Sequence, residues 1–248
     1  MGTLLQVNHL CKQFEGNEVL REISLSIQVG EYVAVMGRSG CGKTTLLYNI
    51  SGMDRATRGR VFFEKKEITA LSEEEMSSIR LEKMGFIFQK SNLLKNLSLR
   101  DNIVFPGFQL GKESRREINK KADDLMKRTG ISQIAHYDIR KVSGGQLQRA
   151  AICRAFINTP SILFADEPTG ALNSAATKEI MDIFHDINQE GAAIVLVTHD
   201  AKVAARAERV IYLEDGKMKD ELRLGKFREE KKLQREIKMS DWLQNMGF

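Results

Sequence analysis

The chain has 248 residues and a formal net charge of +5, and 42% of its residues are hydrophobic while 29% are charged. This length allows one large α/β domain or two small ones, and the mild basic excess indicates no more than a general attraction to anionic partners. No run of about eighteen apolar residues occurs, and the three cysteines lack the spacing of a disulfide framework or a zinc site. We therefore expect no membrane span, a reducing cytoplasmic setting, and a role at membranes only through a partner.

The N-terminal part predicts β-strands that lead to a buried strand. Apolar residues alternate over 4–10 and 19–27, and an apolar run follows at 32–36. Phe14 lies at the first turn between these strands. An aromatic side chain there either stacks on an adenine ring or closes the edge of the core, and the sequence leaves both alternatives open.

A glycine-rich turn follows the apolar run and precedes a helical pattern. This is the context that makes G-x-x-x-x-G-K-T a phosphate-binding loop. Its glycines allow backbone N–H groups to approach phosphate oxygens, Lys43 adds a charge at the β- and γ-phosphates, and Thr44 offers a hydroxyl to Mg²⁺. The predicted ATP-binding residues are Phe14, Gly37, Arg38, Ser39, Gly40, Cys41, Gly42, Lys43, Thr44 and Thr45.

Beyond a short strand at 60–63 and a charged helix at 73–83, a second buried strand at 84–88 ends in Gln89. Open α/β sheets bind ligands outside the carboxyl ends of their strands. Gln89 is therefore well placed to reach Mg²⁺ or the attacking water.

Residues 91–142 change to helical patterns without strong strands, which predicts a helical insertion into the α/β core. Its apolar residues between 93 and 108 form either a docking surface for a partner helix or the small core of the insertion itself.

A second anion-binding element begins at Ser143, which is placed as the N-cap of a helix. Two glycines in the first turn cost helix stability, and this cost is explained if backbone amides approach a second phosphate group closely. The residues of this turn are Ser143, Gly144, Gly145 and Gln146.

Two further buried strands end in chemically active side chains. The strand at 161–165 leads into Asp166 and Glu167, of which the first is the candidate Mg²⁺ ligand and the second positions and polarises the hydrolytic water. The strand at 192–197 ends near His199, which we interpret as a sensor of the γ-phosphate.

The last part of the chain predicts a hairpin and a helical extension. A strand at 209–213 and the turn Asp215-Gly216 form the hairpin. A charged segment at 225–248 follows, with one apolar face formed by Met239, Trp242, Leu243 and Met246. This face either packs back on the body or contacts a membrane partner or lipid.

These motifs, in this order, resemble the nucleotide-binding subunit of ABC transporters. The resemblance implies a P-loop NTPase (RecA-like) α/β core with an antiparallel β subdomain and an inserted helical subdomain. It places the nucleotide-binding domain at 1–224, the helical subdomain at about 91–158 and a charged C-terminal extension at 225–248. In family terms the motifs are Walker A at 37–45, the Q-loop at Gln89, the signature at 143–146, Walker B ending in Asp166 and Glu167, the D-loop at 171–173 and the switch histidine His199.

Within the family, phrases such as Phe86-Ile87-Phe88-Gln89 resemble the lipoprotein-release and macrolide-export branch, and most of all its bacitracin-type antimicrobial-peptide transporters. The resemblance implies a cytoplasmic ATPase held at the inner face of the cell membrane by a permease. Its work would be antimicrobial-peptide export, resistance or sensing, or lipoprotein and lipid handling. Three positions depart from the pattern: Ile139, Val142 and Asn173, the last of which replaces the D-loop aspartate.

The family mechanism implies a homodimer that encloses two ATP molecules. Ser143 and Gly145 of one copy would face the γ-phosphate held by Lys43 of the other. Thr44, Gln89 and Asp166 would surround Mg²⁺, while Glu167 and His199 act in hydrolysis.

Another class of function competes with the transporter interpretation, namely a soluble ABC ATPase that scaffolds assembly without a permease. Chromosome-maintenance and translation ABC proteins are disfavoured, because the chain has one cassette and no coiled-coil insertion. We therefore expect no nucleic-acid partner.

Overall fold

The structure is a computed structural model that describes residues 2–247. The chain forms two compact units, one from the described parts of Met1–Met76 and Ala193–Phe248 and the other from Ser77–Ala192. Only the first unit is discontinuous in sequence, since the second is inserted between its two segments. The domain boundaries expected from the sequence, at 224 and at about 91 and 158, stay a prediction.

An antiparallel sheet forms one part of the first unit. Its strands lie in the order β2-β1-β4-β5. Val7 pairs with Leu25 on one side and with Val61 on the other, and all three are buried, so the apolar alternation of the sequence faces a core. The strands are β1 (Thr3–Phe14), β2 (Asn17–Gln28), β4 (Arg58–Phe63) and β5 (Lys66–Glu67).

The other strands of the first unit lie in the order β10-β9-β3-β8. β3 pairs in parallel with β8 and β9, and β10 returns antiparallel to β9, as the predicted hairpin requires. Every residue of β3 and β8 is buried, because parallel strands are covered on both faces and therefore read as continuous apolar runs. The strands are β3 (Tyr32–Met36), β8 (Ala193–Val197), β9 (Arg209–Glu214) and β10 (Lys217–Arg223).

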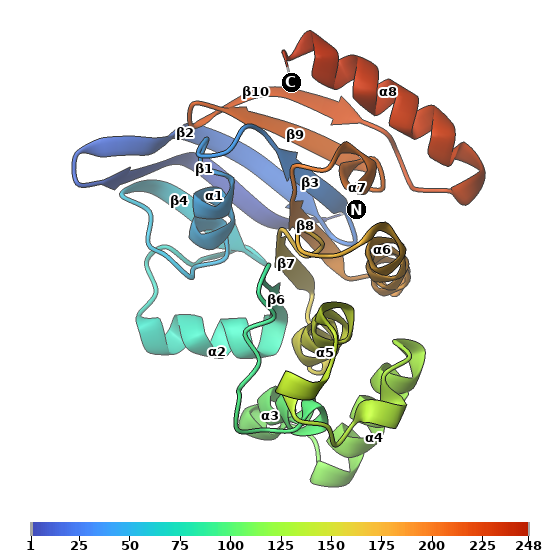
Figure 1. The fold of residues 1–248 in the computed structure, drawn as a ribbon. Coiled ribbons are helices and arrows are strands. Elements are labelled where there is room, and N and C mark those ends of the chain that lie inside the picture. The colour runs from blue at the N-terminus through green and yellow to red at the C-terminus, as the bar shows by residue number, and fades with distance from the viewer. Residues whose placement is uncertain (1, 248) are drawn as a thin grey trace. The chain divides into compact units, whose positions relative to one another are not determined.

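The C-terminal segment of the first unit forms α8 (Lys232–Asn245), which runs alongside β10 (Figure 1). Met239 and Leu243 are buried. Trp242 packs edge-on against Tyr212, with ring centroids 6.1 Å apart, and its Nε1–H donates a 2.7 Å hydrogen bond to Asp220. The apolar face of this helix therefore packs on its own unit, which is the first of the two alternatives that the sequence left open.

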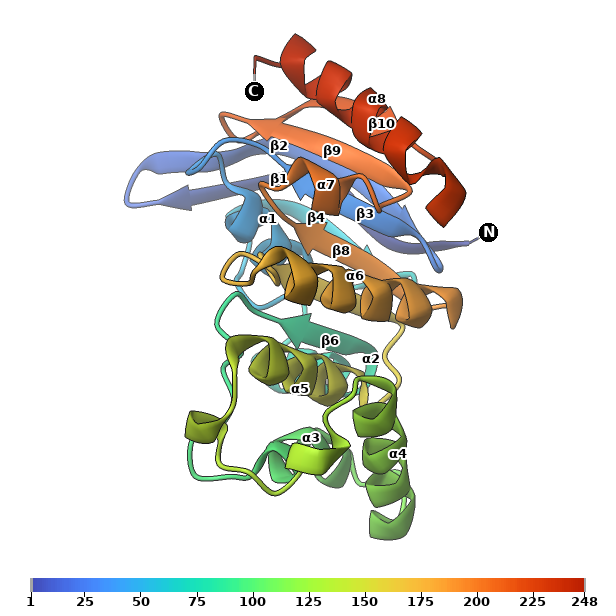
Figure 2. The same ribbon diagram turned by 45° about the vertical axis from the view of Figure 1, so that its right-hand side comes forward.

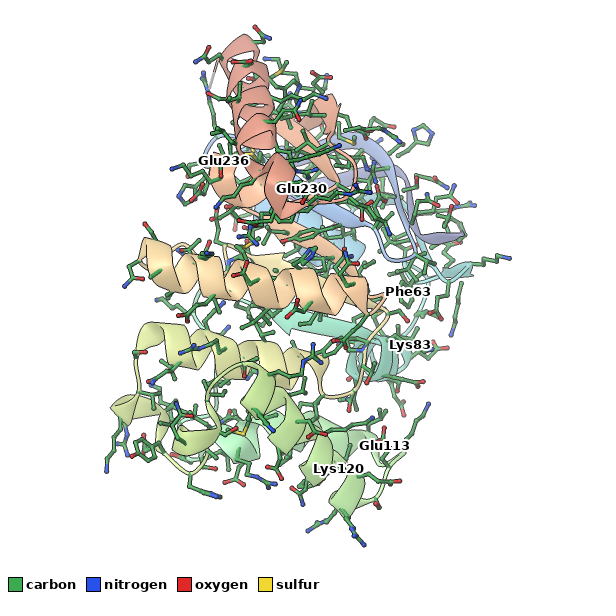
Figure 3. The ribbon with its side chains drawn as sticks, turned by 90° about the vertical axis from the view of Figure 1, so that its right-hand side faces the viewer. Phe63, Lys83, Glu113, Lys120, Glu230 and Glu236 are labelled. Carbon is green, nitrogen blue, oxygen red and sulfur yellow. The ribbon has the colours of Figure 1, made fainter. Side chains whose placement is uncertain are left out.

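Arg235 anchors α8 through backbone carbonyls. Its Nε–H donates to Ala205 at 2.7 Å, and Nη1 donates to Leu224 and Gly225 at 2.9 Å each. The side chain is buried, and this burial lowers the pKa of its guanidinium. Two short elements flank the contacts of this anchor: α7 (Ala201–Ala204) ends directly before Ala205, and the 3₁₀ turn η3 (Glu229–Lys231) directly precedes α8. Figure 3 labels Glu230 in that turn and Glu236 on α8.

The second unit combines two parallel strands with helices. β6 (Met84–Ile87) pairs with β7 (Ile162–Asp166), and Ile87 lies opposite Ala165. Figure 2 shows α3, α4 and α5 grouped together. The helices and turns are α3 (Leu99–Leu110), α4 (Arg115–Arg128), η1 (Ser132–Ile134), η2 (Ile139–Lys141), α5 (Gly144–Phe156) and α6 (Ser174–Gln189). α2 (Glu73–Lys83) begins in the first unit and ends in the second, with the bounds that the sequence predicted.

The apolar residues at the start of the predicted insertion divide between core and surface. Leu93, Leu99 and Ile103 join the core of the helical group, whereas Leu94 and Phe105 are exposed. Charged residues cover the outer end of this group, where Figure 3 labels Glu113 and Lys120. The core alternative therefore holds for the buried residues of this stretch, and a docking surface at the exposed ones stays a prediction.

The composition leads us to expect no membrane-spanning helix and no disulfide framework or zinc site. Between residues 2 and 247 no helix is long and apolar enough to cross a membrane. The three cysteines are free and buried, and burial raises the pKa of Cys153 to about 12.

Candidate nucleotide-binding site

The glycine-rich loop joins β3 to α1 (Lys43–Ile50) in the first unit. Gly37 has a φ of 151°, and a Cβ at this position would lie 2.1 Å from the carbonyl oxygen of Leu213. Gly42 is the N-cap of α1 with a φ of 103°, and no side chain caps the helix. No side chain therefore caps the first amides of α1. A helix N-terminus of this kind is a preformed binding site for an anion.

Lys43 folds back over the loop in this structure. Its Nζ donates to the carbonyl oxygens of Gly37 at 2.9 Å and Arg38 at 3.0 Å. Cys41 is buried beside these residues, and burial raises the pKa of its thiol, while the nearby charge of Lys43 opposes that rise. The ammonium is consequently held close to the amides that would surround a phosphate.

His199 lies at the same edge of its unit as the loop. Val35 pairs with Val197 in parallel, and the N–H of Thr198 donates to the carbonyl oxygen of Val35 at 3.2 Å. Gly37 lies two positions after Val35, and His199 lies two positions after Val197, so both follow the same end of this strand pair. His199 is exposed, as a residue that contacts a ligand phosphate must be.

Phe14 ends β1 and is 46% exposed, so it does not close the core. The Nζ of Lys12 lies 4.5 Å from the centroid of its ring. The carbonyl oxygen of Val19, on the partner strand of the hairpin, lies 3.0 Å from where a Cβ of Gly42 would be. The hairpin that carries Phe14 therefore lies against the phosphate loop.

In the second unit, β7 ends in the two predicted acids. Asp166 is buried. Glu167 has a φ of 48°, a left-handed conformation that costs a residue with a side chain about 1–3 kcal/mol. The N–H of Gly170 donates to its carbonyl oxygen at 3.1 Å and closes a tight turn. Backbone strain of this kind concentrates at functional sites.

Gln89 lies near that turn. The pairing of Ile87 with Ala165 brings the ends of β6 and β7 to one edge, and Gln89 Nε2 lies 3.2 Å from where a Cβ of Gly170 would be. The side chain is therefore close to the strand end that carries Asp166 and Glu167.

The turn that begins at Ser143 opens α5 with a capping box. Ser143 Oγ accepts from the N–H of Gln146 at 3.3 Å, and Gln146 Oε1 accepts from the N–H of Ser143 at 2.8 Å. The predicted N-cap is confirmed. Ser143 and Gly144 are exposed, while a Cβ on Gly145 would lie 3.4 Å from Cβ of Ala176 in α6.

Asn173, which departs from the family pattern, caps α6. Its Oδ1 accepts from the N–H of Ala176 at 2.9 Å. Asparagine and aspartate are equivalent as N-caps, so the replacement keeps the local structure and removes a charge.

The predicted residues thus fall into two groups. Phe14, the phosphate loop at 37–45 and His199 belong to the first unit; Gln89, the turn at 143–146, Asp166 and Glu167 belong to the second. The sequence did not predict a role for Lys12, because Leu10, Cys11 and Lys12 are buried in succession and the alternation of the strand gives no signal there. It also missed Arg235, for which an isolated arginine in a charged segment carries no local signal.

A buried parallel strand, a glycine loop with left-handed residues and a helix whose first amides lack a side-chain cap define a P-loop nucleotide-binding α/β protein. Comparison with known proteins identifies the family within this class. A sequence model of the family described as "ABC transporter" matches residues 20–170. The Lipoprotein-releasing system ATP-binding protein LolD of Aquifex aeolicus is 40% identical over 222 residues, which cover 90% of this chain and 99% of LolD.

Two further proteins extend the comparison. The Macrolide export ATP-binding/permease protein MacB of Campylobacter jejuni is 38% identical over 248 residues, 99% of this chain but 38% of MacB. The dimeric post-hydrolysis structure of the ATP-binding cassette MJ0796, bound to ADP and Pi, superposes with a TM-score of 0.84 at 35% identity, covering 90% of this chain and all of that one.

The chain belongs to the ABC transporter family of ATP-binding proteins. It has the P-loop fold expected from the sequence, and it is an ABC ATPase. The interpretation as a scaffold without a permease is not favoured.

Proposed function

We propose that this chain hydrolyses ATP to ADP and phosphate and thereby drives a membrane permease of the lipoprotein-release and macrolide-export branch. The observation that carries the proposal is the phosphate loop, in which left-handed glycines, the α1 N-terminus and Lys43 converge within one unit. Phosphate groups fit this combination because it offers N–H donors and a positive charge with no bulky side chain in the way.

Mg²⁺ fits the oxygen donors that the sequence predicts. Thr44 supplies a hydroxyl, Asp166 a carboxylate and Gln89 an amide oxygen, and Mg²⁺ prefers few protein oxygens together with substrate phosphates. When bound, the ion would supply charge neutralisation at the β- and γ-phosphates.

The side chains of the chain itself would carry the remaining chemistry. Lys43 would move from its loop carbonyls to the phosphate oxygens. Glu167 would accept a proton from the attacking water, whose oxygen forms the new bond to the γ-phosphorus as the bond to the β-γ bridging oxygen breaks. His199 would hydrogen-bond a γ-phosphate oxygen and position it for that attack.

A second copy of the chain would complete each site. The exposed turn at Ser143 and Gly144 offers helix amides and a hydroxyl to an anion, which supports contact with the γ-phosphate held by the partner. The dimeric cassette structures are similar to this chain over 90% of its length, which supports the same closed arrangement here.

A permease would hold the ATPase at the inner face of the cell membrane. In MacB the ATP-binding part and the permease belong to one protein, and this chain spans 38% of it. Leu94, Phe105 and Tyr137 are exposed apolar side chains of the second unit. Hydrogen bonds tie the backbone at Leu94 and at Tyr137 to the same helix, α3. The N–H of Leu94 donates to Asn102 Oδ1 at 2.7 Å, and the N–H of Leu99 donates to the carbonyl oxygen of Tyr137 at 3.2 Å. We infer that a cytoplasmic segment of the permease binds there.

The transported material would be amphipathic and membrane-associated. Relatives named for lipoprotein release and macrolide export support this class. The resemblance of sequence segments such as residues 86–89 to bacitracin-type transporters favours antimicrobial peptides in particular, in export, resistance or sensing.

Affinity purification of the Glu167→Gln variant from native membranes in ATP tests the proposal. The variant should turn over about 10²–10⁴-fold more slowly while it still binds ATP, because a positioned acid–base group contributes about that factor. A multi-spanning permease should co-purify with it. Turnover equal to that of the wild type would refute the role of Glu167, and recovery of soluble proteins alone would refute the permease.

A further inference from the structure

The ring of Phe14 is covered on one face by a lysine that is itself almost buried. Lys12 is 9% exposed, and its Nζ lies 4.5 Å from the ring centroid. Phe14 is 46% exposed, so the ring stays open elsewhere. A cation on one face of an aromatic ring is attracted by its π-electrons and draws them toward itself.

Two acceptors in the loop after α1 hold the ammonium in this place. Lys12 Nζ donates to Asp54 Oδ1 at 2.8 Å and to the carbonyl oxygen of Arg55 at 2.7 Å. Both acceptors lie more than forty positions along the chain from Lys12. The position of the ammonium is therefore decided by that loop and not by the strand that carries the lysine.

The loop is in turn connected to the helix that begins at the phosphate loop. Asn49, buried in α1, donates from Nδ2 to Asp54 Oδ2 at 3.3 Å and to the carbonyl oxygen of Thr45 at 2.9 Å. The N–H of Asp54 donates to the carbonyl oxygen of Tyr48 at 3.1 Å. A continuous set of polar contacts thus runs from Phe14 to Thr45, within one unit.

We propose that Lys12 is a positioning residue for the nucleotide base, which holds and polarises the Phe14 ring so that its open face favours a purine over a pyrimidine. The inference rests on the proposed function, because it requires ATP binding, and it takes base stacking on Phe14 as the role of that ring, which is one of the two alternatives that the sequence left open. A ring whose π-electrons are drawn to one side stacks better with a large, electron-rich purine on the other. The connection to Asn49 keeps the base at a set distance from the phosphate site.

Binding measurements with three ligands test this proposal on the full-length chain. Titration calorimetry with ATP, CTP and inorganic tripolyphosphate separates the base from the phosphates. Lys12→Met keeps the length of the side chain and removes the charge. We expect it to weaken ATP binding about 3–10-fold, a fraction of the free energy of one base–aromatic stack, to weaken CTP binding less, and to leave tripolyphosphate binding unchanged. Lys66→Met, on β5 of the same sheet, is the matched control and should change none of them.

A double-mutant cycle gives the second readout. Phe14→Leu should weaken ATP binding, and Lys12→Met should add nothing in the Phe14→Leu background, because the lysine acts through the ring. Lys12→Arg retains a cation and should keep the ATP to CTP preference near that of the wild type. If Lys12→Met does not fold by circular dichroism, Asp54→Asn weakens the same anchor and should lower the ATP to CTP preference in the same direction.

Four outcomes would overturn the proposal, and they separate it from the proposed function. An equal loss for all three ligands would make the lysine merely structural. Additive effects of Lys12→Met and Phe14→Leu would show that the lysine does not act through the ring. A wild-type chain that binds neither ATP nor tripolyphosphate would overturn both proposals, whereas normal ATP binding with an unchanged base preference in Lys12→Met would overturn this one alone.

Discussion

The guanidinium of Arg38 donates a 2.7 Å hydrogen bond from Nη2 to the carbonyl oxygen of Gly247, which lies 209 positions further along the chain. Arg38 belongs to the phosphate loop, and Gly247 follows the end of α8. The C-terminal helix of this protein therefore reaches the loop that is proposed to bind ATP.

Replacing Arg38 by glutamine should free the turn after α8. The shorter amide cannot span to the carbonyl of Gly247, so we expect hydrogen exchange at residues 246 and 247 to accelerate about tenfold, the equivalent of one hydrogen bond. Exchange measured by mass spectrometry on a C-terminal peptide checks this. Lys217→Gln, an exposed change on β10, is the control, and equal exchange in both variants would contradict the expectation.

Arg235→Met should release α8 from the first unit. The substitution leaves several buried carbonyl oxygens without their donor, which costs about 2–4 kcal/mol. Trp242 is the only tryptophan and packs on Tyr212, so its fluorescence reports the docking of the helix. We expect a red-shifted emission and easier quenching by iodide. Arg228→Met, a change at an exposed neighbour, should leave the emission unchanged. If Trp242 of Arg235→Met emitted at the wavelength of the wild type, the helix would be docked without its anchor.

Lys43→Ala should abolish ATP binding. In this structure the ammonium holds two carbonyl oxygens of the loop, so its removal takes away both the charge at the phosphates and a support of the loop. Equilibrium binding of a fluorescent ATP analogue checks this, with Glu167→Gln as the variant that retains affinity. An unchanged dissociation constant would refute the phosphate-loop assignment.

Asn173→Asp should change the cooperativity of ATP hydrolysis and not the stability, whereas Asn173→Ala should lower the stability. Aspartate keeps the N-cap of α6, so the free energy of unfolding should stay within about 0.5 kcal/mol, whereas alanine loses the cap and about 1 kcal/mol. The restored charge of aspartate should raise the Hill coefficient of ATP hydrolysis. Urea unfolding and rate measurements against ATP concentration test the pair. Greater destabilisation by aspartate than by alanine would exclude the capping role.

Glu221→Gln should destabilise the protein in a pH-dependent manner. Burial raises the pKa of this carboxyl, but its hydrogen bonds to Arg209 outweigh that effect, and the net pKa lies below the ordinary 4.5. The carboxylate therefore contributes stability above pH 4.5, and the contribution disappears as the pH falls through the lowered pKa. We expect a loss of about 1–2 kcal/mol at pH 7 that shrinks toward acid pH.

Urea unfolding of this variant between pH 7 and pH 4 measures the effect. Glu229→Gln, an exposed change, should cost little at any pH. A loss in Glu221→Gln that stays constant across the range would indicate a role in packing rather than a charge interaction.

The parts of this fold that the sequence predicted are those with local signals. α2 begins and ends at Glu73 and Lys83 as expected, because Ser72 and Glu75 form a capping box at its start. β7 and β8 are continuous apolar runs, since both faces are buried. The phosphate loop is recognisable because glycine, lysine and threonine must stand at set spacings within one turn.

The sequence by itself thus determined the secondary structure, the P-loop class and the candidate residues around ATP. Only the tertiary structure decided that Lys12 reaches Asp54, that Arg38 reaches Gly247 and that Arg235 of α8 is buried. The physical reason is that periodicity and capping act within a few residues, whereas these contacts join positions 10–209 apart. Their partners are mostly backbone carbonyls, which every residue has and which leave no mark in the sequence.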